Sequence, residues 1–436
     1  MLAAAMTAHV GQSIPKQCQS WSASKGAYRF LSNGEVEAVA IGQPHRDLTR
    51  QACRDHPVVL CVQDTTELDF TAHPRTRGLG KIGKGTTRGM LQHTTLAVTP
   101  AGQVLGILDE RWHNRVEAPA NETRSQRQQR WTERDEWGDA VEAVGVGPEQ
   151  TRFIHVADRE ADVWGMLDRC TRIGVGFVIR AKCDRRVEEC TDHLWSYLQK
   201  QPVRGRMTVT VSRQCNRHRT VTRRPRKAPV NIRYASVRLE APQNYPKYQG
   251  QSLVVWAVLV SELAAPRGEK PVQWLLLCSE PVQTLEDAQK VIGWYTCRWV
   301  IEQWHRVLKE GCKLEQSQLD DAKDLQRLSA ILSIIAVRLL QLRDLARACG
   351  DNPQPLQSSV PWIWIAVVAK LSGKSPEQMT PQDFWQGIAR RGGWLARKSD
   401  RSPGWKVIWR GWYEISLLAA GAELALTSNS QNKRCG

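Results

Sequence analysis

Three acidic residues lie at positions in the sequence from which they could jointly bind metal ions. Asp64 ends the apolar, β-branched run 58–63, and Asp158 ends a second buried run, 153–157. If these two strands are neighbours in one sheet, both carboxylates converge on one edge of it. Hard divalent cations prefer carboxylate oxygens, and a pair of such cations neutralises the attacking and leaving oxygens of phosphoryl transfer. We therefore expect metal-dependent chemistry on a phosphate.

A third carboxylate lies on a predicted helix. Tyr295, Arg298, Glu302 and Lys309 are spaced so that they fall within roughly a 60° arc of a helix with 3.6 residues per turn. Cations beside a carboxylate suit a site that binds both metal and phosphate, because Arg and Lys grip the phosphate while Glu302 grips the ion. A solvated helix face with stabilising ion pairs is the simpler interpretation of the same pattern.

The elements that must position these residues form a recognisable series. The stretches 91–98 and 103–112 alternate like the strands of a hairpin around a turn at 100–102. A helix-favouring stretch, 125–146, precedes the strand 153–157, a helix to about residue 172 and the strand 175–181, which is a β-α-β pattern. Alternating segments over 183–280 then indicate a separate β-rich insertion. Helical texture returns at residue 285.

Composition points to a nucleic-acid partner. The chain of 436 residues has 61 Lys plus Arg against 44 Asp plus Glu, a formal charge of +17, and such a field attracts polyanions. The sequence shows neither a signal peptide nor an uninterrupted apolar stretch long enough to span a membrane, so we expect a cytoplasmic protein. Its twelve scattered cysteines are interpreted as reduced thiols.

Three blocks together resemble a known family. The pattern Tyr295-x2-Arg298-x3-Glu302-x6-Lys309 is similar to the Tyr-Arg-Glu-Lys signature of insertion-sequence transposases of the IS-four type, which carry a DDE acidic triad. Residues 63–68 and 157–162 resemble the blocks that hold the first and second aspartate of that triad. The order and spacing agree over nearly the whole chain from about Gly26.

The resemblance implies an α/β fold. Its catalytic core would be RNase H-like, a mixed five-stranded sheet flanked by helices, with a β-rich insertion and a helical C-terminal tail. We expect a short helical DNA-binding region at 1–52, the first part of the core at 53–182, the insertion at 183–280, the second part of the core at 281–348, and a helical dimerisation region at 349–436.

The resemblance also implies a reaction and its cofactors. Two divalent ions, Mg²⁺ or Mn²⁺, would be held by Asp64, which bridges both, and by Asp158 and Glu302, which take one each. The enzyme would nick the transposon end, form and open a DNA hairpin, and join the freed 3′ hydroxyl to target DNA. A homodimer would hold two DNA ends in a synaptic complex inside a bacterial cell, associated with the nucleoid.

Further residues are expected to contact the DNA. By resemblance, Tyr295, Arg298 and Lys309 hold phosphates near the scissile bond, and Arg306, one turn before Lys309, could assist. Trp274 matches the family position on which a displaced base stacks, Trp299 is a second aromatic candidate, and a buried core tryptophan is the simpler interpretation of Trp274. Arg180 and Lys182 alternate onto one face near the active edge, as phosphate contacts or as an exposed edge pair.

Two other functions stay open. Only about sixty residues precede Asp64, whereas relatives have a longer N-terminal helical domain. The chain could therefore be an N-terminally truncated, catalytically silent DNA-binding protein that inhibits transposition by pairing with intact subunits. A general RNase H-like nuclease is the third interpretation, and cleavage of arbitrary duplexes without joining would identify it.

Overall fold

A ten-stranded mixed sheet organises the molecule. The computed structural model describes residues 2–83, 85–115, 119–123, 126, 130–188, 192–211, 214–215, 221–243, 246–347, 356, 360–398, 400 and 402–432. The strand order is β2-β3-β1-β5-β6-β12-β11-β10-β7, with β4 paired to β3. The strands are β1 (Val58–Asp69), β2 (Gly80–Lys81), β3 (Arg88–Val98), β4 (Val104–His113), β5 (Arg152–Ala157), β6 (Gly176–Arg180), β7 (Gly205–Val211), β10 (Arg226–Glu240), β11 (Ser252–Glu262) and β12 (Gln273–Cys278).

Parallel pairing is confined to the middle of this sheet. β1 pairs with β5 and β5 with β6 in parallel, whereas β3, β4 and β12 join antiparallel. The predicted hairpin is therefore confirmed as β3 and β4, and the predicted β-α-β unit as β5, a helix and β6. A short separate sheet pairs β8 (Gln214–Cys215) with β9 (Val221–Arg223).

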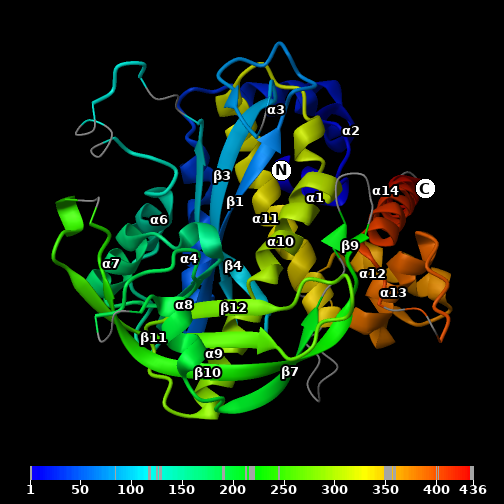
Figure 1. Ribbon diagram of the computed structural model, residues 1–436. Helices are drawn as coiled ribbons and strands as arrows, with labels where there is room; N and C mark the ends of the chain where they lie inside the picture. Colours follow the sequence, from blue (N-terminus) through cyan, green and yellow to red (C-terminus); the bar gives the residue numbers. More distant parts are fainter. Residues whose placement is uncertain are drawn as a thin grey trace.

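Helices cover both faces of the sheet (Figure 1). They are α1 (Leu2–Ala8), α2 (Ile14–Cys18), α3 (Trp21–Leu31), α4 (Ala38–Cys53), α6 (Glu136–Val144), α7 (Trp164–Ile173), α8 (Leu194–Lys200), α9 (Leu285–Thr296), α10 (Trp299–Arg306), α11 (Ala322–Arg347), α12 (Trp362–Ser372), α13 (Pro381–Arg391) and α14 (Trp405–Asn432). Successive side chains of a strand point to opposite faces. Leu60 and Val62 of β1 accordingly pack in the core that contains α9, α10 and α11, and Val59 and Cys61 pack in the core that contains α6 and α7.

The strands of residues 183–280 do not form a separate unit. β12 pairs with β6, matching Leu277 with Ile179, and β11, β10 and β7 extend the same sheet. In Figure 1 they sweep across the lower part of the view as its continuation. The expected five strands β4, β3, β1, β5 and β6 are present, but the sheet is longer than expected, because the β-rich segment adds to its edge.

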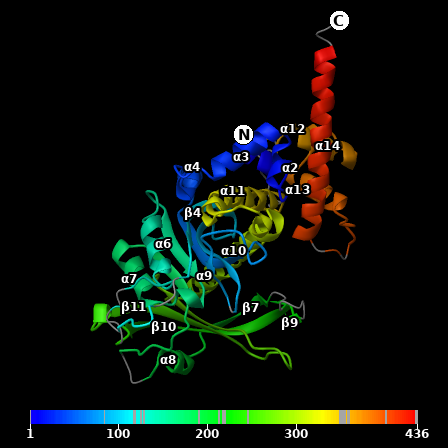
Figure 2. The same cartoon turned by 90° about the horizontal axis from the view of Figure 1, so that it is seen from above.

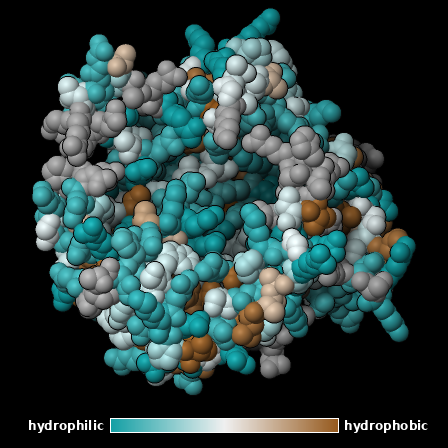
Figure 3. All heavy atoms as spheres, viewed as in Figure 1, coloured by the Kyte–Doolittle hydropathy of each residue, from teal (hydrophilic) through white to brown (hydrophobic). Residues whose placement is uncertain are grey.

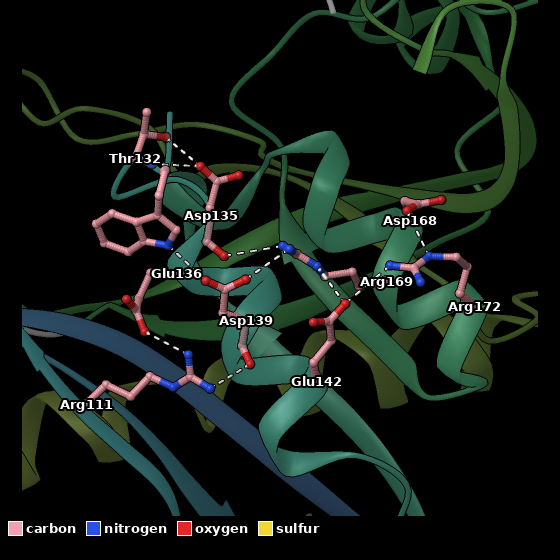
Figure 4. Close-up of polar contacts among 10 residues, drawn as sticks. Arg111, Thr132, Asp135, Glu136, Asp139, Glu142, Asp168, Arg169 and Arg172 are labelled. Carbon is pink, nitrogen blue, oxygen red and sulfur yellow. Dashed lines mark hydrogen bonds and ion pairs between the residues drawn. The ribbon is translucent and has the colours of Figure 1, made fainter. Parts of the chain in front are cut away.

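Ion pairs join α6 to α7 on one side of the sheet (Figure 4). Arg169 of α7 contacts Asp139 and Glu142 of α6, each at 2.9 Å, and Arg111 of β4 lies 3.6 Å from Glu136. The acidic side chains of this group are therefore paired with arginines. These ion pairs join α6 and α7 at the surface, above the apolar contacts between the two helices.

Helices near both ends of the described chain pack on the half of the molecule that contains α9, α10 and α11. Met6 of α1 and Leu31 of α3 belong to the same hydrophobic cluster as Trp304 of α10 and Ile415 of α14. A Cβ on Gly311 would lie 2.2 Å from the Trp409 ring, and the backbones of Gly11 and Gly311 come so close that a Cβ on Gly11 would lie 2.5 Å from the Gly311 carbonyl oxygen. Glycine is required at such contacts. Figure 2 shows α14 running outward from this junction.

The central helix α11 is the core element of this half. In the part of the chain that the structure describes, only α11 has the length and apolar composition of a membrane span. Of its most apolar stretch, 78% is buried inside the protein. Helix α11 also holds the N-terminal region, because its Arg327 donates hydrogen bonds to the carbonyl oxygens of Leu31 and Val36.

Candidate active site

The parallel pair β1 and β5 brings Asp64 and Asp158 to the same level of the sheet. Their last matched residues are Val62 and Val156, and each aspartate lies two residues further along its strand direction. The adjacency of the two strands is as predicted. The prediction that Asp64 ends its strand is wrong: β1 continues to Asp69 because it pairs with β3 over that length. Asp64 therefore stands where the neighbour β5 stops and leaves an open side.

Asp158 is fixed by a short helical turn. It follows β5 directly and caps the 3-10 turn Arg159–Ala161, where its carboxylate accepts the backbone N–H of Glu160 at 2.9 Å. An N-capping carboxylate satisfies a donor that the turn leaves free. Its negative charge also acts on Asp64, whose pKa it raises.

The residues Tyr295, Arg298, Glu302 and Lys309 do not share one straight helix, contrary to the prediction. Tyr295 lies in the last turn of α9, Arg298 caps the start of α10, Glu302 lies in α10, and Lys309 lies in the π-helical turn Val307–Gly311. A π turn takes up an extra residue and shifts the phase of the residues after it. The four side chains thus reach the site from three consecutive segments.

Arg298 links two of the three acids. Its Nη2 lies 2.5 Å from Oε1 of Glu302, and its Nη1 lies 3.8 Å from Oδ2 of Asp64. Arg298 is only 8% exposed. The guanidinium therefore sits between the carboxylates from β1 and α10, and these acids lie on one side of the molecule.

The charge of Asp64 is poorly stabilised at this position. The pKa of its carboxyl is raised to about 7, chiefly by burial; the Arg298 guanidinium opposes that rise, and the negative charges of Asp158 and Glu302 add to it. Such a pKa shift, produced by burial together with neighbouring acids, is typical of functional sites. The negative charges of the other two acids thus act on Asp64, as a shared cation site requires.

The donors fit a hard divalent cation in their chemistry, since all three are carboxylates. As the side chains stand, however, no group of three or more His, Cys, Asp or Glu side chains among the described residues is close enough to hold a metal ion. The Arg298 guanidinium lies between two of the acids, Asp64 and Glu302.

An aromatic and basic group lies next to the acids. The rings of Trp274 in β12 and Tyr295 meet edge to face with centroids 5.4 Å apart. Arg180, at the end of β6, donates to the carbonyl oxygen of Gln273 at 2.9 Å. Burial raises the pKa of the Tyr295 hydroxyl, and the charges of Arg180 and Arg298 oppose that rise. Arg180, Trp274 and Tyr295 are therefore brought together with the acids.

Other predicted residues lie at the margin of the site. The Lys309 ammonium donates to the carbonyl oxygen of Glu67 in β1 and lies 3.2 Å from Glu315. Arg306 and Lys182 are exposed, and Trp299 is 39% exposed. Figure 3 shows a hollow at the centre of this face, bordered mainly by hydrophilic residues, in the part of the view where β1 and α10 lie.

Sequence reasoning missed His305. It is buried one turn after Glu302, its Nδ1 lies 3.9 Å from Asp64 Oδ2, and its Nε2 has no hydrogen-bond partner in the described structure. Burial lowers the pKa of its imidazole to about 3, with the charges of Lys309 and Arg298 acting in the same sense, so the ring is neutral. The signal was its position three residues after Glu302, which places both on one helix face.

It also missed a buried clamp at Asp162. This carboxylate accepts the backbone N–H groups of Lys182 and Cys183 at 2.6 and 2.7 Å and pairs with the Arg185 guanidinium. Its side chain is fully buried. The contact ties the turn after Asp158 to the segment that follows Arg180, the last residue of β6, and that carries Lys182.

One comparison with known proteins bears on function. Residues 1–36 match the model of a family described as transposase DNA-binding. They contain α1, α2 and α3. The match supports a transposase that binds DNA, and it suggests a DNA-processing enzyme.

Proposed function

We propose that this protein is a DDE transposase of the IS-four type that cuts and joins DNA by phosphoryl transfer at Asp64, Asp158 and Glu302. The single observation that carries the proposal is the meeting of Asp64 and Glu302 at Arg298, with Asp158 at the same level of the adjacent parallel strand, where its charge acts on Asp64. The transposase DNA-binding match at 1–36 supports it independently. So does the net charge of +17.

We propose an RNase H-like core for this site. Support comes from the five strands β4, β3, β1, β5 and β6, with parallel pairing only at β1, β5 and β6. Helices α6 and α7 pack on one face and α9, α10 and α11 on the other. The remaining strands extend the edge of this core.

The three acids would hold the cofactor of the reaction. Bound Mg²⁺ or Mn²⁺ would neutralise charge on the attacking and leaving oxygens of the scissile phosphate. Asp64 would contribute to both ions, and Asp158 and Glu302 to one each. Asp158 keeps its orientation through the N–H of Glu160, which limits the reorganisation needed when DNA binds.

The surrounding residues would hold the DNA. Arg298 and Lys309 would bind phosphates beside the scissile bond, with Arg306, Arg180 and Lys182 further out. Tyr295 would orient one phosphate oxygen through its hydroxyl. Trp274 would stack on a displaced base after separating from Tyr295, and Trp299, with 39% of its surface exposed, would offer a second ring.

The silent inhibitor is not the favoured alternative. Residues 1–36 match the transposase DNA-binding family, and this is the region where weakened end recognition was expected. We propose that the protein acts in the cytoplasm on transposon ends and target DNA, as a homodimer whose C-terminal helices, α12 to α14, contribute the subunit contact.

The proposal is tested by DNA cleavage with the full chain. The substrate is duplex DNA carrying the sequences that flank this gene, and nicked, hairpin and joined products are separated on denaturing gels. Glu302→Gln should lower the nicking rate on the order of 100- to 1,000-fold, because it removes one carboxylate from the metal site. Asp64→Asn and Asp158→Asn should behave alike.

The matched control is Glu310→Gln, the same substitution at an exposed glutamate eight residues further along. It should leave the rate unchanged. Full activity of Glu302→Gln would remove the proposal. Cleavage of unrelated duplexes without joining would instead identify a general nuclease.

A further inference from the structure

Arg298 makes contacts that a role as a DNA ligand does not account for. Its guanidinium faces inward, 2.5 Å from Glu302 Oε1 and 3.8 Å from Asp64 Oδ2. With 8% of its surface exposed, it lies within the protein. A cation is thus already placed between two acids proposed to hold metal.

Local structure holds the guanidinium there. Arg298 is the residue that precedes α10, four residues before Glu302, so the first turn of that helix presents the Glu302 carboxylate to it. Its Cζ lies 5.3 Å from the ring centroid of Trp299. The arginine therefore has a partner in the site and a second, aromatic contact at its exposed side.

A metal ion and this guanidinium would compete for the same oxygen. A divalent ion needs direct contact with carboxylate oxygens at about 2.0 to 2.6 Å, and Oε1 of Glu302 now accepts a guanidinium N–H. Two cations in a largely buried space also repel each other strongly. Without either cation, on the other hand, the partly buried carboxylates of Asp64 and Glu302 would be uncompensated. The site requires one cation or the other.

We propose that Arg298 is a placeholder: it stands in for a metal ion in the metal-free protein, and a divalent ion displaces it from Glu302 toward a DNA phosphate. The inference rests on the proposed function, since replacement of the Arg298 guanidinium by a metal ion is needed only in a metal-dependent DNA enzyme. Arginine suits it because the planar guanidinium fork pairs with carboxylate and with phosphate in the same two-pronged geometry.

The test measures Mn²⁺ binding to the full chain without DNA, from the electron paramagnetic resonance signal of free Mn²⁺ during titration. Arg298→Gln should bind Mn²⁺ about tenfold or more tightly than the wild type, because the competing cation is gone. Glu302→Gln should bind it more weakly. The matched control is Arg338→Gln, the same substitution at an exposed arginine of α11, and its affinity should be unchanged.

The melting temperature is a second readout, which keeps the test valid if Arg298→Gln is less stable than the wild type. Metal-free Arg298→Gln should melt at a lower temperature than the wild type, and Mn²⁺ should raise its melting temperature more than it raises that of the wild type. NaCl at equal ionic strength should not reproduce the difference.

The outcomes separate the two proposals. Equal Mn²⁺ affinity and equal Mn²⁺-induced stabilisation of Arg298→Gln and the wild type would overturn the placeholder, while the metal-dependent function would stand if Glu302→Gln still binds more weakly than the wild type. Absence of Mn²⁺ binding by every form, with no effect on melting, would overturn both.

Discussion

At the scale of single residues, Asp64 stabilises the folded, metal-free protein only when it is protonated. Its pKa in the folded state is about 7, mainly because of burial, against an ordinary value near 4. The favourable contribution of the neutral carboxyl to the free energy of unfolding is therefore fully present below the ordinary pKa. It is lost as the pH rises through about 7.

Asp64→Asn should accordingly stabilise the metal-free protein above pH 7. We expect a gain of about 1 to 2 kcal/mol in the free energy of unfolding. This is less than the whole pKa shift implies, because the side chain is 23% exposed and Arg298 loses a charged neighbour. Urea denaturation at about pH 8 and about pH 5 measures the gain, which should shrink at the lower pH.

The control is Asp168→Asn, which removes the charge of an aspartate paired with Arg172 on the outer side of α7. It should show no gain at either pH. A stability of Asp64→Asn equal to that of the wild type at about pH 8 would contradict the assigned cause, which is burial of a charge next to two other acids.

At the scale of elements, the clamp at Asp162 holds two strand ends in register. Asp162→Ala should cost about 3 to 5 kcal/mol in the free energy of unfolding, because it leaves the buried Arg185 guanidinium and two backbone N–H groups without their acceptor. Chemical denaturation measures the loss. Glu160→Ala, at an exposed position of the same turn, should cost less than about 0.5 kcal/mol. Equal losses would show that the clamp contributes nothing specific.

The sequence predicts local elements of this fold better than distant pairings. The apolar runs before Asp64 and Asp158 are strong strand signals because buried parallel strands are apolar on both faces. Their placement side by side is confirmed. The pairing of β12 with β6 joins residues far apart in the chain. Alternation gives the face of each residue, but it does not give the partner strand, so the β-rich segment looked separate.

The break between α9 and α10 was invisible for a related reason. It falls at Cys297 and Arg298, where neither proline nor glycine marks an end. Helical spacing grouped Tyr295, Glu302 and Lys309 on one face, but their roles toward metal and DNA stay predictions. Arg298 pointing inward, and the neutral His305 beside Asp64, depend on tertiary packing that spacing alone does not specify.

At the scale of the whole molecule, positive charge and the N-terminal region act together on DNA. In α3, within the matched residues 1–36, Lys25 and Arg29 are exposed and Trp21 is 82% exposed. Lys25→Ala should weaken binding to duplex DNA. It should also reduce the slope of log K against log salt concentration by about 1, because one phosphate contact is lost.

Fluorescence anisotropy over a series of salt concentrations gives the slope. The control is Lys370→Ala, which removes the same charge from an exposed position in α12 and should leave the slope unchanged. An equal decrease in both variants would mean that DNA responds only to the overall charge of +17.

The shared core of α1, α3 and α10 has a consequence for where the proposed enzyme would cut DNA. Met6 and Leu31 pack in one cluster with Ile301 and Trp304, which flank Glu302. DNA bound by residues 1–36 would then be held at a fixed number of base pairs from the three acids. The protein would thereby set the distance between the bound sequence and the break. If base pairs are inserted between the sequence bound by residues 1–36 and the transposon tip, the break should stay at the same distance from the bound sequence. It would then fall inside the element instead of moving with the tip.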